Sequence, residues 1–197
     1  MNWLEATAVA FGIISVYLSV RQNIWSWPTA IVNVSLYFLV FRDAKLYADM
    51  GLQVIYFILS VYGWYEWLYG GANRTELRVS RGTPRMTVAV VAVAGASVAI
   101  LGTVLARSTD AALPYVDSTT TSTSLVAQWM MTRKVLENWA VWMAVDVVYV
   151  GMFIYKSLYL TAGLYAVFFA LAAMGFAQWK RSYDGDRALP SASMAAA

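Results

Sequence analysis

Two polar side chains stand near the middle of long apolar segments of this 197-residue chain. Asn33 lies within residues 24–41, and Asp146 lies within residues 138–155 as the one carboxylate at such a central position. An ionised Asp at the centre of a membrane costs about 2.5–3.5 kcal/mol or more on insertion scales. We therefore interpret both residues as lining a binding site or a path, and the alternative is a hydrogen-bond contact between helices.

The segment around Asp146 places further polar and aromatic side chains beside it. Asn138, Trp142, Asp146 and Tyr149 follow one another at spacings of four, four and three residues, which puts them on one face of an α-helix. From this face and from polar or aromatic positions of the other segments we predict a set of substrate-binding residues. They are Asn33, Tyr37, Gln53, Trp64, Gln128, Asn138, Trp142, Asp146 and Tyr149.

The composition excludes most other chemistry. Of the residues, 60% are hydrophobic and 13% are charged, and the mean hydropathy is +0.57. A soluble domain carries about 25% charged residues, so a soluble enzyme, a nucleic-acid-binding module and a disordered chain are excluded. The chain has no cysteine and no histidine, which removes thiolate nucleophiles and the usual general base. We find no catalytic set, expect no cofactor and no metal, and predict that the protein is not an enzyme.

Long apolar segments predict an all-α membrane protein. A helix needs about 20 residues to cross a hydrocarbon core of about 30 Å. Six segments approach or reach that length: residues 3–20, 24–41, 46–69, 86–105, 138–155 and 158–179. Residues 115–132 are rich in serine and threonine, and hydropathy alone predicts a loop there.

An internal repeat identifies residues 115–132 as a further helix. When residues 17–67 are compared with residues 129–179, at a shift of 112 positions, 12 of the 51 pairs are identical. They include Trp27/Trp139, Trp67/Trp179, Gly51/Gly163 and Gly63/Gly175. The same shift maps 3–20 onto 115–132. We therefore predict seven transmembrane helices, arranged as two parallel three-helix repeats joined by the helix 86–105, a 3+1+3 plan known among transporters.

The repeat also suggests what its shared residues do. The four repeated tryptophans lie near segment ends, which favours anchoring at the membrane interface over ligand contact. The repeated glycines are expected to allow close helix packing. The position equivalent to Asp146 is Val34, with Asn33 beside it. The two faces thus differ in chemistry, as an asymmetric ligand in a pseudo-symmetric cavity would require.

Basic residues predict the orientation. Ten of the 14 fall on one predicted side: Arg21, Arg74, Arg78, Arg81, Arg85, Arg133, Lys134, Lys180, Arg181 and Arg187. This side is expected to be cytoplasmic, which places the N-terminus outside and the C-terminus inside. The predicted organisation is a first repeat over 1–69, a loop and linker helix over 70–107, a second repeat over 108–181 and a disordered tail over 182–197.

Longer motifs in both halves resemble the PnuC family of vitamin transporters. The first half carries Asn33-x3-Tyr37-x3-Phe41, the run 45–53 and Tyr62-Gly63-Trp64-x2-Trp67. The second half carries Gln128-Trp129-x3-Arg133-Lys134-x2-Glu137-Asn138-Trp139-x2-Trp142-x3-Asp146. The resemblance covers about residues 10–182. It implies a fold similar to that of the SWEET sugar carriers, a homotrimer in the lipid bilayer and no nucleic-acid partner.

The resemblance further implies uptake of nicotinamide riboside across a bacterial inner membrane by facilitated diffusion, with phosphorylation in the cytoplasm as the trap. This vitamin is a cation with an aromatic ring, an amide and hydroxyl groups, which suit Trp, Asn, Gln and Asp side chains. Thiamine is also an aromatic cation, and related branches carry thiamine or riboflavin, so these substrates remain open. Proton-coupled transport through Asp146 and a non-transporting receptor or assembly subunit also remain open.

Overall fold

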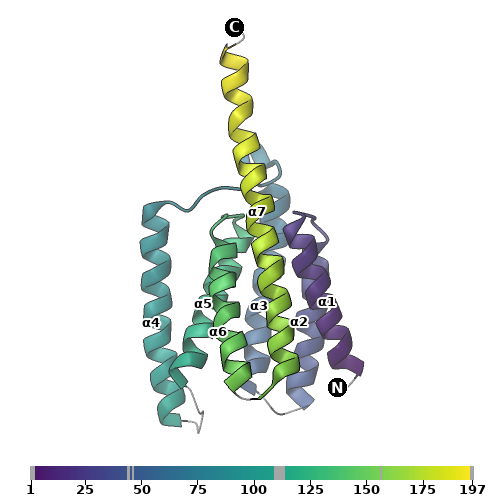
Figure 1. Ribbon diagram of the computed structural model, residues 1–197, viewed down its shortest axis with the longest axis vertical. Helices are drawn as coiled ribbons and strands as arrows, with labels where there is room; N and C mark the ends of the chain where they lie inside the picture. The colour runs from purple at the N-terminus through teal and green to yellow at the C-terminus, as the bar shows by residue number, and fades with distance from the viewer. Residues whose placement is uncertain (1–2, 44, 46, 109–113, 156, 196–197) are drawn as a thin grey trace.

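The computed structural model describes residues 3–43, 45, 47–108, 114–155 and 157–195. These residues form seven α-helices and one short 3-10 turn (Figure 1). The helices are α1 (Trp3–Val20), α2 (Ser26–Asp43), α3 (Tyr47–Tyr69), α4 (Pro84–Ser108), α5 (Pro114–Thr132), α6 (Asn138–Tyr155) and α7 (Tyr159–Ala195), and the turn is η1 (Ala72–Arg74). The serine- and threonine-rich segment is therefore helical, as the repeat predicted.

The turns between helices fall at equivalent positions of the two repeats. Gln22 and Lys134 have left-handed backbone, with φ of 53° and 47°, and Lys45 and Ser157 both have φ of 58°. The N–H groups of Gln22 and Lys134 each donate to a carbonyl three residues earlier, at 3.0 Å. A left-handed residue is a common way to end a helix, so the repeat shares its chain reversals as well as its sequence.

The helices of the two repeats close into a ring. Each helix packs against the next in the order α1, α2, α3, α5, α6 and α7, and α7 packs back against α1. The remaining helix, α4, packs against α5 and stands at the edge of the bundle (Figure 1). The two contacts that join one repeat to the other are therefore α3 with α5 and α7 with α1.

The two ends of the ring differ in charge. The upper end in Figure 1 is where α1, α3 and α5 end and where α2 and α6 begin. It carries the ten basic residues predicted to be cytoplasmic, and we call it the basic end. The loop between α3 and α4 lies there, and α7 extends beyond it (Figure 1).

Four of the described helical segments are long and apolar enough to cross a membrane. They are Trp3–Val20, Pro84–Ser108, Asn138–Tyr155 and Thr161–Arg187. The last of these continues past the predicted end of its helix, since α7 runs to Ala195. Residues 182–195, which we expected to be disordered, are therefore helical, and residues 196–197 lie outside the described part of the chain.

Contacts with the α3–α4 loop explain why the helix continues. Tyr183 lies under the guanidinium groups of Arg81 and Arg187, at 5.5 and 5.7 Å from its ring centroid. Asp186 lies 4.0 Å from Arg78. In the sequence, residues 182–187 read only as a polar segment. In the folded protein, arginine side chains lie over the ring of Tyr183 and near the carboxylate of Asp186.

The four repeated tryptophans form the core of the basic end. Trp27, Trp67, Trp139 and Trp179 are 2%, 2%, 1% and 0% exposed. The centroid of Trp67 lies 5.2 Å from that of Trp27 and 5.8 Å from that of Trp179, and Trp139 lies 5.3 Å from Trp179. The prediction that these residues anchor the chain at the membrane interface is wrong, because the rings pack against one another inside the ring of helices.

Only one of the two repeated glycine pairs makes room for these rings. A Cβ atom added to Gly63 would meet the ring of Trp27, and one added to Gly175 would meet the ring of Trp139. A Cβ atom at Gly51 or Gly163 would meet nothing within 4 Å. The expectation of close packing thus holds for Gly63 and Gly175, and Gly51 and Gly163 make no such contact.

Candidate functional site

A cavity of about 430 Å³ lies inside the ring of helices. All six ring helices line it, and its volume falls within the range of about 300–1,000 Å³ that is typical of small-molecule sites. Trp27 and Trp139 line it towards the basic end, and Tyr37, Phe41 and Tyr149 line it further along α2 and α6. The cavity is therefore continuous along much of the length of these two helices.

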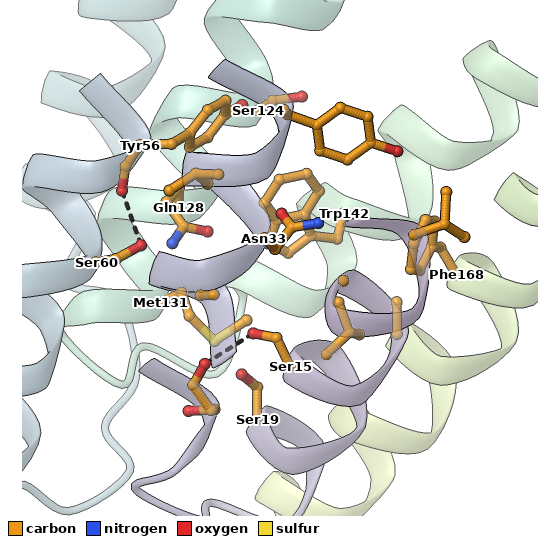
Figure 2. A pocket seen from close by; sticks show the side chains of 18 of the residues that line it. Ser15, Ser19, Asn33, Tyr56, Ser60, Ser124, Gln128, Met131, Trp142 and Phe168 are labelled. Carbon is orange, nitrogen blue, oxygen red and sulfur yellow. Dashed lines mark hydrogen bonds between the residues drawn. The ribbon is translucent and has the colours of Figure 1, made fainter. Parts of the chain in front are cut away.

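Seven of the nine predicted binding residues line this cavity. They are Asn33, Tyr37, Gln53, Gln128, Trp142, Asp146 and Tyr149. Figure 2 shows Asn33, Gln128 and Trp142 around its middle, with Ser15 and Ser19 on α1. Residues predicted from four different segments are thus brought to one space.

The other two predicted residues lie elsewhere. Asn138 is fully buried and donates its side-chain amide to the carbonyl of Val135 at 2.6 Å, so it holds the turn that opens α6. Trp64 is 38% exposed and does not line the cavity. The helix-face argument for Asn138 missed that it is the first residue of α6, where a side chain more often caps a turn than meets a ligand.

Asp146 is the one carboxylate among the described residues that line the cavity. The residue is 4% exposed, and within the described parts of the chain its carboxylate has no hydrogen-bond donor and no cation in contact. Trp142 and Tyr149, about one turn away on either side, line the same cavity. A buried charge without a partner is costly, so this site favours a ligand that brings a positive charge or a hydrogen-bond donor.

Asn33 faces the cavity from the opposite repeat. Its amide nitrogen donates to the carbonyl of Ala8 at 2.7 Å, which fixes the side chain and leaves its amide oxygen as an acceptor for a ligand. Gly12 makes this possible, since a Cβ atom there would lie 3.0 Å from the Asn33 amide nitrogen. At the equivalent positions of the second repeat stand Ser124 and Val145, so the two sides of the cavity differ.

Small hydroxyl groups complete the lining and were missed from the sequence. Ser15, Ser19 and Ser26 line the cavity near the basic end, and Ser60 and Ser124 line it from α3 and α5 (Figure 2). Ser15 donates to the carbonyl of Ser26 at 2.9 Å. The spacing of Ser15 and Ser19, four residues apart in an otherwise apolar segment, is the signal that would have revealed them.

The tyrosines beyond Asp146 form an aromatic cluster in the second repeat. The ring centroid of Tyr165 lies 4.5 Å from that of Tyr149 and 5.3 Å from that of Phe153. The first repeat has the stacked pair Tyr37 and Phe41 at 5.6 Å, but it has Gln53 where the second has Tyr165. The cavity therefore offers aromatic faces together with amide groups, which suits a ligand with both kinds of surface.

Comparisons with known proteins identify the family of this chain. A family model described as nicotinamide mononucleotide transporter matches residues 2–181. The nicotinamide riboside transporter PnuC of Escherichia coli is 28% identical over 216 aligned residues, which cover 96% of this chain and 90% of that protein. The riboflavin/roseoflavin transporter RibM of Streptomyces davaonensis is 24% identical over 180 residues, which cover 90% of this chain and 84% of that protein.

The fold is also similar to that of a solved transporter. The crystal structure of the vitamin B3 transporter PnuC aligns with a TM-score of 0.70 at 26% sequence identity, covering 91% of this chain and 81% of that chain. The family match spans nearly the whole chain, including every residue that lines the cavity. The chain therefore belongs to the nicotinamide mononucleotide transporter family, and it is a multi-pass membrane protein of a transporter family and not an enzyme.

Proposed function

We propose that the protein is a carrier for a small aromatic vitamin cation, with nicotinamide riboside as its substrate. Its relatives are named as transporters of nicotinamide riboside or of riboflavin. Nicotinamide riboside carries a positive charge on an aromatic ring, and riboflavin is neutral. The choice between them rests on the charge of the cavity.

Asp146 beside Trp142 is the observation that carries the proposal. Asp146 is a residue that is 4% exposed, and its carboxylate, which lacks a partner among the described residues, has the charge that a cationic ring needs. An indole face attracts a desolvated cation by up to about 2 kcal/mol. We expect the pyridinium ring against Trp142, its charge near Asp146, and its amide and hydroxyl groups among Asn33, Gln53 and Gln128.

The membrane arrangement follows from the same proposal. All seven helices span the bilayer in a 3+1+3 plan, with the polar α5 shielded from lipid by α3, α4 and α6. The basic end faces the cytoplasm of a bacterial inner membrane, and the N-terminus lies outside. The carrier equilibrates the vitamin by facilitated diffusion, phosphorylation inside traps it, and the assembly is a homotrimer.

Binding of a vitamin panel tests the substrate. The purified protein is heated with nicotinamide riboside, thiamine or riboflavin, and the shift in its melting temperature is measured. The proposal predicts the largest shift with nicotinamide riboside. A larger shift with thiamine would support a cationic ligand but would replace nicotinamide riboside as the substrate. A larger shift with riboflavin, which is neutral, would overturn both the substrate and the argument from the charge of Asp146.

Uptake into liposomes tests the mechanism. Labelled nicotinamide riboside should enter vesicles that contain the protein when no ion gradient is present, and should stop at equal concentrations inside and outside. If uptake stops when proton and sodium gradients are dissipated, the transport is coupled to an ion and is not facilitated diffusion. Vesicles that stay impermeable, with protein that binds no vitamin, would favour a receptor or assembly subunit.

A further inference from the structure

The two interfaces between the repeats are alike in their central contact. At the α3–α5 interface, Trp67 donates its indole N–H to the carbonyl of Met131 at 3.1 Å. At the α1–α7 interface, Trp179 donates to the carbonyl of Ser19 at 3.0 Å. Both bonds lie at the basic end and close the cavity there. The residues around them, however, are not equivalent, and the difference has a consequence for how the cavity opens.

The α3–α5 interface is reinforced by an ion pair. Arg133 lies 3.2 Å from Glu66 and donates to the hydroxyl of Tyr62 at 2.8 Å. The Glu66 side chain is 14% exposed, so the pair is only partly screened by solvent. At the α1–α7 interface the positions equivalent to Glu66 and Tyr62 hold Gln178 and Met174, which leaves Arg21 without a carboxylate there.

The loop between α3 and α4 reinforces the same interface. Ser80 donates to the carbonyl of Lys134 at 3.0 Å and accepts from the N–H of Leu136 at 2.9 Å, and Gly82 donates to the carboxylate of Glu137 at 2.9 Å. Val79 is 7% exposed and belongs to the same core as Trp67. The chain that leaves α3 is thus fixed to the turn between α5 and α6.

The α3–α4 loop also contacts α7, through Arg81 over Tyr183 and Arg78 near Asp186, but among the described residues it makes no hydrogen bond or ion pair with α1. Beyond the bond from Trp179, one hydrogen bond joins the basic end of the α1–α7 interface among the described residues, from the side-chain amide of Gln22 to Ser182 at 3.0 Å, and this bond is exposed. A second cavity of about 420 Å³ lies beside it and is lined by both residues. Solvent therefore reaches this interface from the basic end.

The residues behind the α1–α7 interface suit a route for a polar ligand. Ser15, Ser19 and Ser26 line the main cavity on this side. The Ser26 hydroxyl and the Trp27 indole N–H are buried without a hydrogen-bond partner among the described residues, and so are the equivalent groups of the second repeat, the Asn138 amide oxygen and the Trp139 indole N–H. A buried polar group without a partner costs about 1–3 kcal/mol, so these groups favour opening of the basic end to water or a ligand, and the choice between the two interfaces rests on the contacts that hold each of them.

We propose that the cavity opens at the basic end by separation of α1 from α7, while the α3–α5 interface, held by the α3–α4 loop, stays closed and acts as the hinge. This inference rests on the proposed carrier function. It differs from symmetric rocking, in which both interfaces would part to the same extent. It also assigns a task to the loop between α3 and α4, the one long loop in the described part of the chain; at the equivalent place in the second repeat α7 continues as a helix.

Cross-linking tests the proposal, and the absence of cysteine from the chain makes it a clean background. The pair Gln22→Cys/Ser182→Cys bridges the α1–α7 interface, and the pair Glu66→Cys/Arg133→Cys bridges the α3–α5 interface. Each variant is compared, in liposomes, before and after treatment with a short bifunctional thiol reagent that is cleaved by reductant. The first cross-link should stop uptake of nicotinamide riboside and the second should leave most of it, with reductant restoring the first.

Two outcomes overturn the proposal: uptake blocked by the second cross-link, or uptake retained with the first fully formed. The untreated variants and the unmodified protein distinguish this proposal from the proposed carrier function. If neither takes up the vitamin before cross-linking, the result counts against the carrier function itself.

Spin labels give a second measurement. The repeat-equivalent pairs Arg21/Arg181 and Tyr69/Arg133 should show a broad and a narrow distance distribution respectively, and equal widths would contradict the hinge.

Discussion

Trp67 donates its indole N–H to the backbone carbonyl of Met131 at 3.1 Å, and this bond joins the last helix of the first repeat to the first helix of the second. Trp179 makes the equivalent bond to Ser19 at 3.0 Å. A side chain that only anchored the protein at the membrane interface would not cross between repeats in this way. The tryptophans therefore hold the closed end of the cavity together.

Removal of one of these bonds should weaken the fold. Trp179→Phe keeps a large ring but loses the donor, and we expect a loss of about 0.5–1.5 kcal/mol in stability, seen as a lower melting temperature by circular dichroism. Trp67→Phe loses the equivalent bond, but Arg133 and the α3–α4 loop still hold its interface. The melting temperature of the first variant should therefore fall further, and the reverse order would contradict the asymmetry of the interfaces.

The glycines that face tryptophan rings should tolerate no side chain. Gly63→Ala and Gly175→Ala each place a methyl group against an indole ring, and overpacking of this kind costs about 1–3 kcal/mol. Gly51→Ala and Gly163→Ala are matched controls, since nothing lies within 4 Å of the added atom, and alanine favours a helix by up to about 1 kcal/mol. Melting temperatures should separate the two pairs, and equal losses would show that the rings can move aside.

The buried ammonium of Lys134 should be dispensable for stability. Lys134 is 6% exposed, with its nitrogen 4.5 Å from the centroid of the Trp67 ring. Burial lowers the pKa of Lys134, although the Glu76 carboxylate opposes the shift. A lowered lysine pKa means that the unfolded chain binds the proton more tightly than the folded protein does.

Stability of the unmodified protein should therefore rise with pH in the window between the lowered pKa of folded Lys134 and its ordinary value. Lys134→Met keeps the length of the side chain and removes the charge. We expect a melting temperature at neutral pH that is equal or higher, with the rise towards alkaline pH reduced. A clear loss of stability at neutral pH would show that the contact of the ammonium with Trp67 outweighs its burial.

The helices and the internal repeat could be predicted from the sequence, because apolar segment length and identity at a fixed shift are visible without knowledge of distant contacts. The length of the apolar segments predicted six of the helices. The identical residues at a fixed shift predicted α5, which hydropathy alone misses because the segment is rich in serine and threonine. The helical residues 182–195 escaped prediction because their partners, Arg78 and Arg81, lie about 100 residues away in the chain.

The lining of the cavity was predictable where depth and helix face were enough. Asp146, Trp142 and Asn33 were found because a polar or aromatic residue in mid-segment has few places to point. Trp139 was misread because its position near a helix end suits both a membrane interface and the core of a bundle. Only the three-dimensional contact with Gly175 and Trp179 distinguishes the two.

The charge of Asp146 should decide between cationic and neutral vitamins. Asp146→Asn keeps the size and polarity of the side chain and removes its charge. Affinity for nicotinamide riboside should fall about tenfold or more, because a hydrogen bond or contact with a charged group contributes about 1.5–3 kcal/mol. Binding of riboflavin, where measurable, should not fall. If the variant still accumulates vitamin fully under a proton gradient, proton coupling through Asp146 is excluded.

The indole ring of Trp142 should contribute to binding of the ligand. It lines the cavity one turn from Asp146 and also packs against the core that holds the four buried tryptophans. Trp142→Ala should cost about 1–2 kcal/mol of binding, or roughly tenfold in affinity, with insertion unchanged and a lower melting temperature of the unliganded protein, because the indole also packs against the buried core. The matched control is Trp64→Ala, since Trp64 is 38% exposed and lies outside the cavity. Trp139→Ala is unsuitable as a control, because Trp139 is 1% exposed and its loss would open the core. Equal binding by the Trp142→Ala and Trp64→Ala proteins would show that the ligand ring lies against the tyrosines around Tyr149 and Tyr165 instead, and Asp146 would then act without an aromatic partner on its own helix.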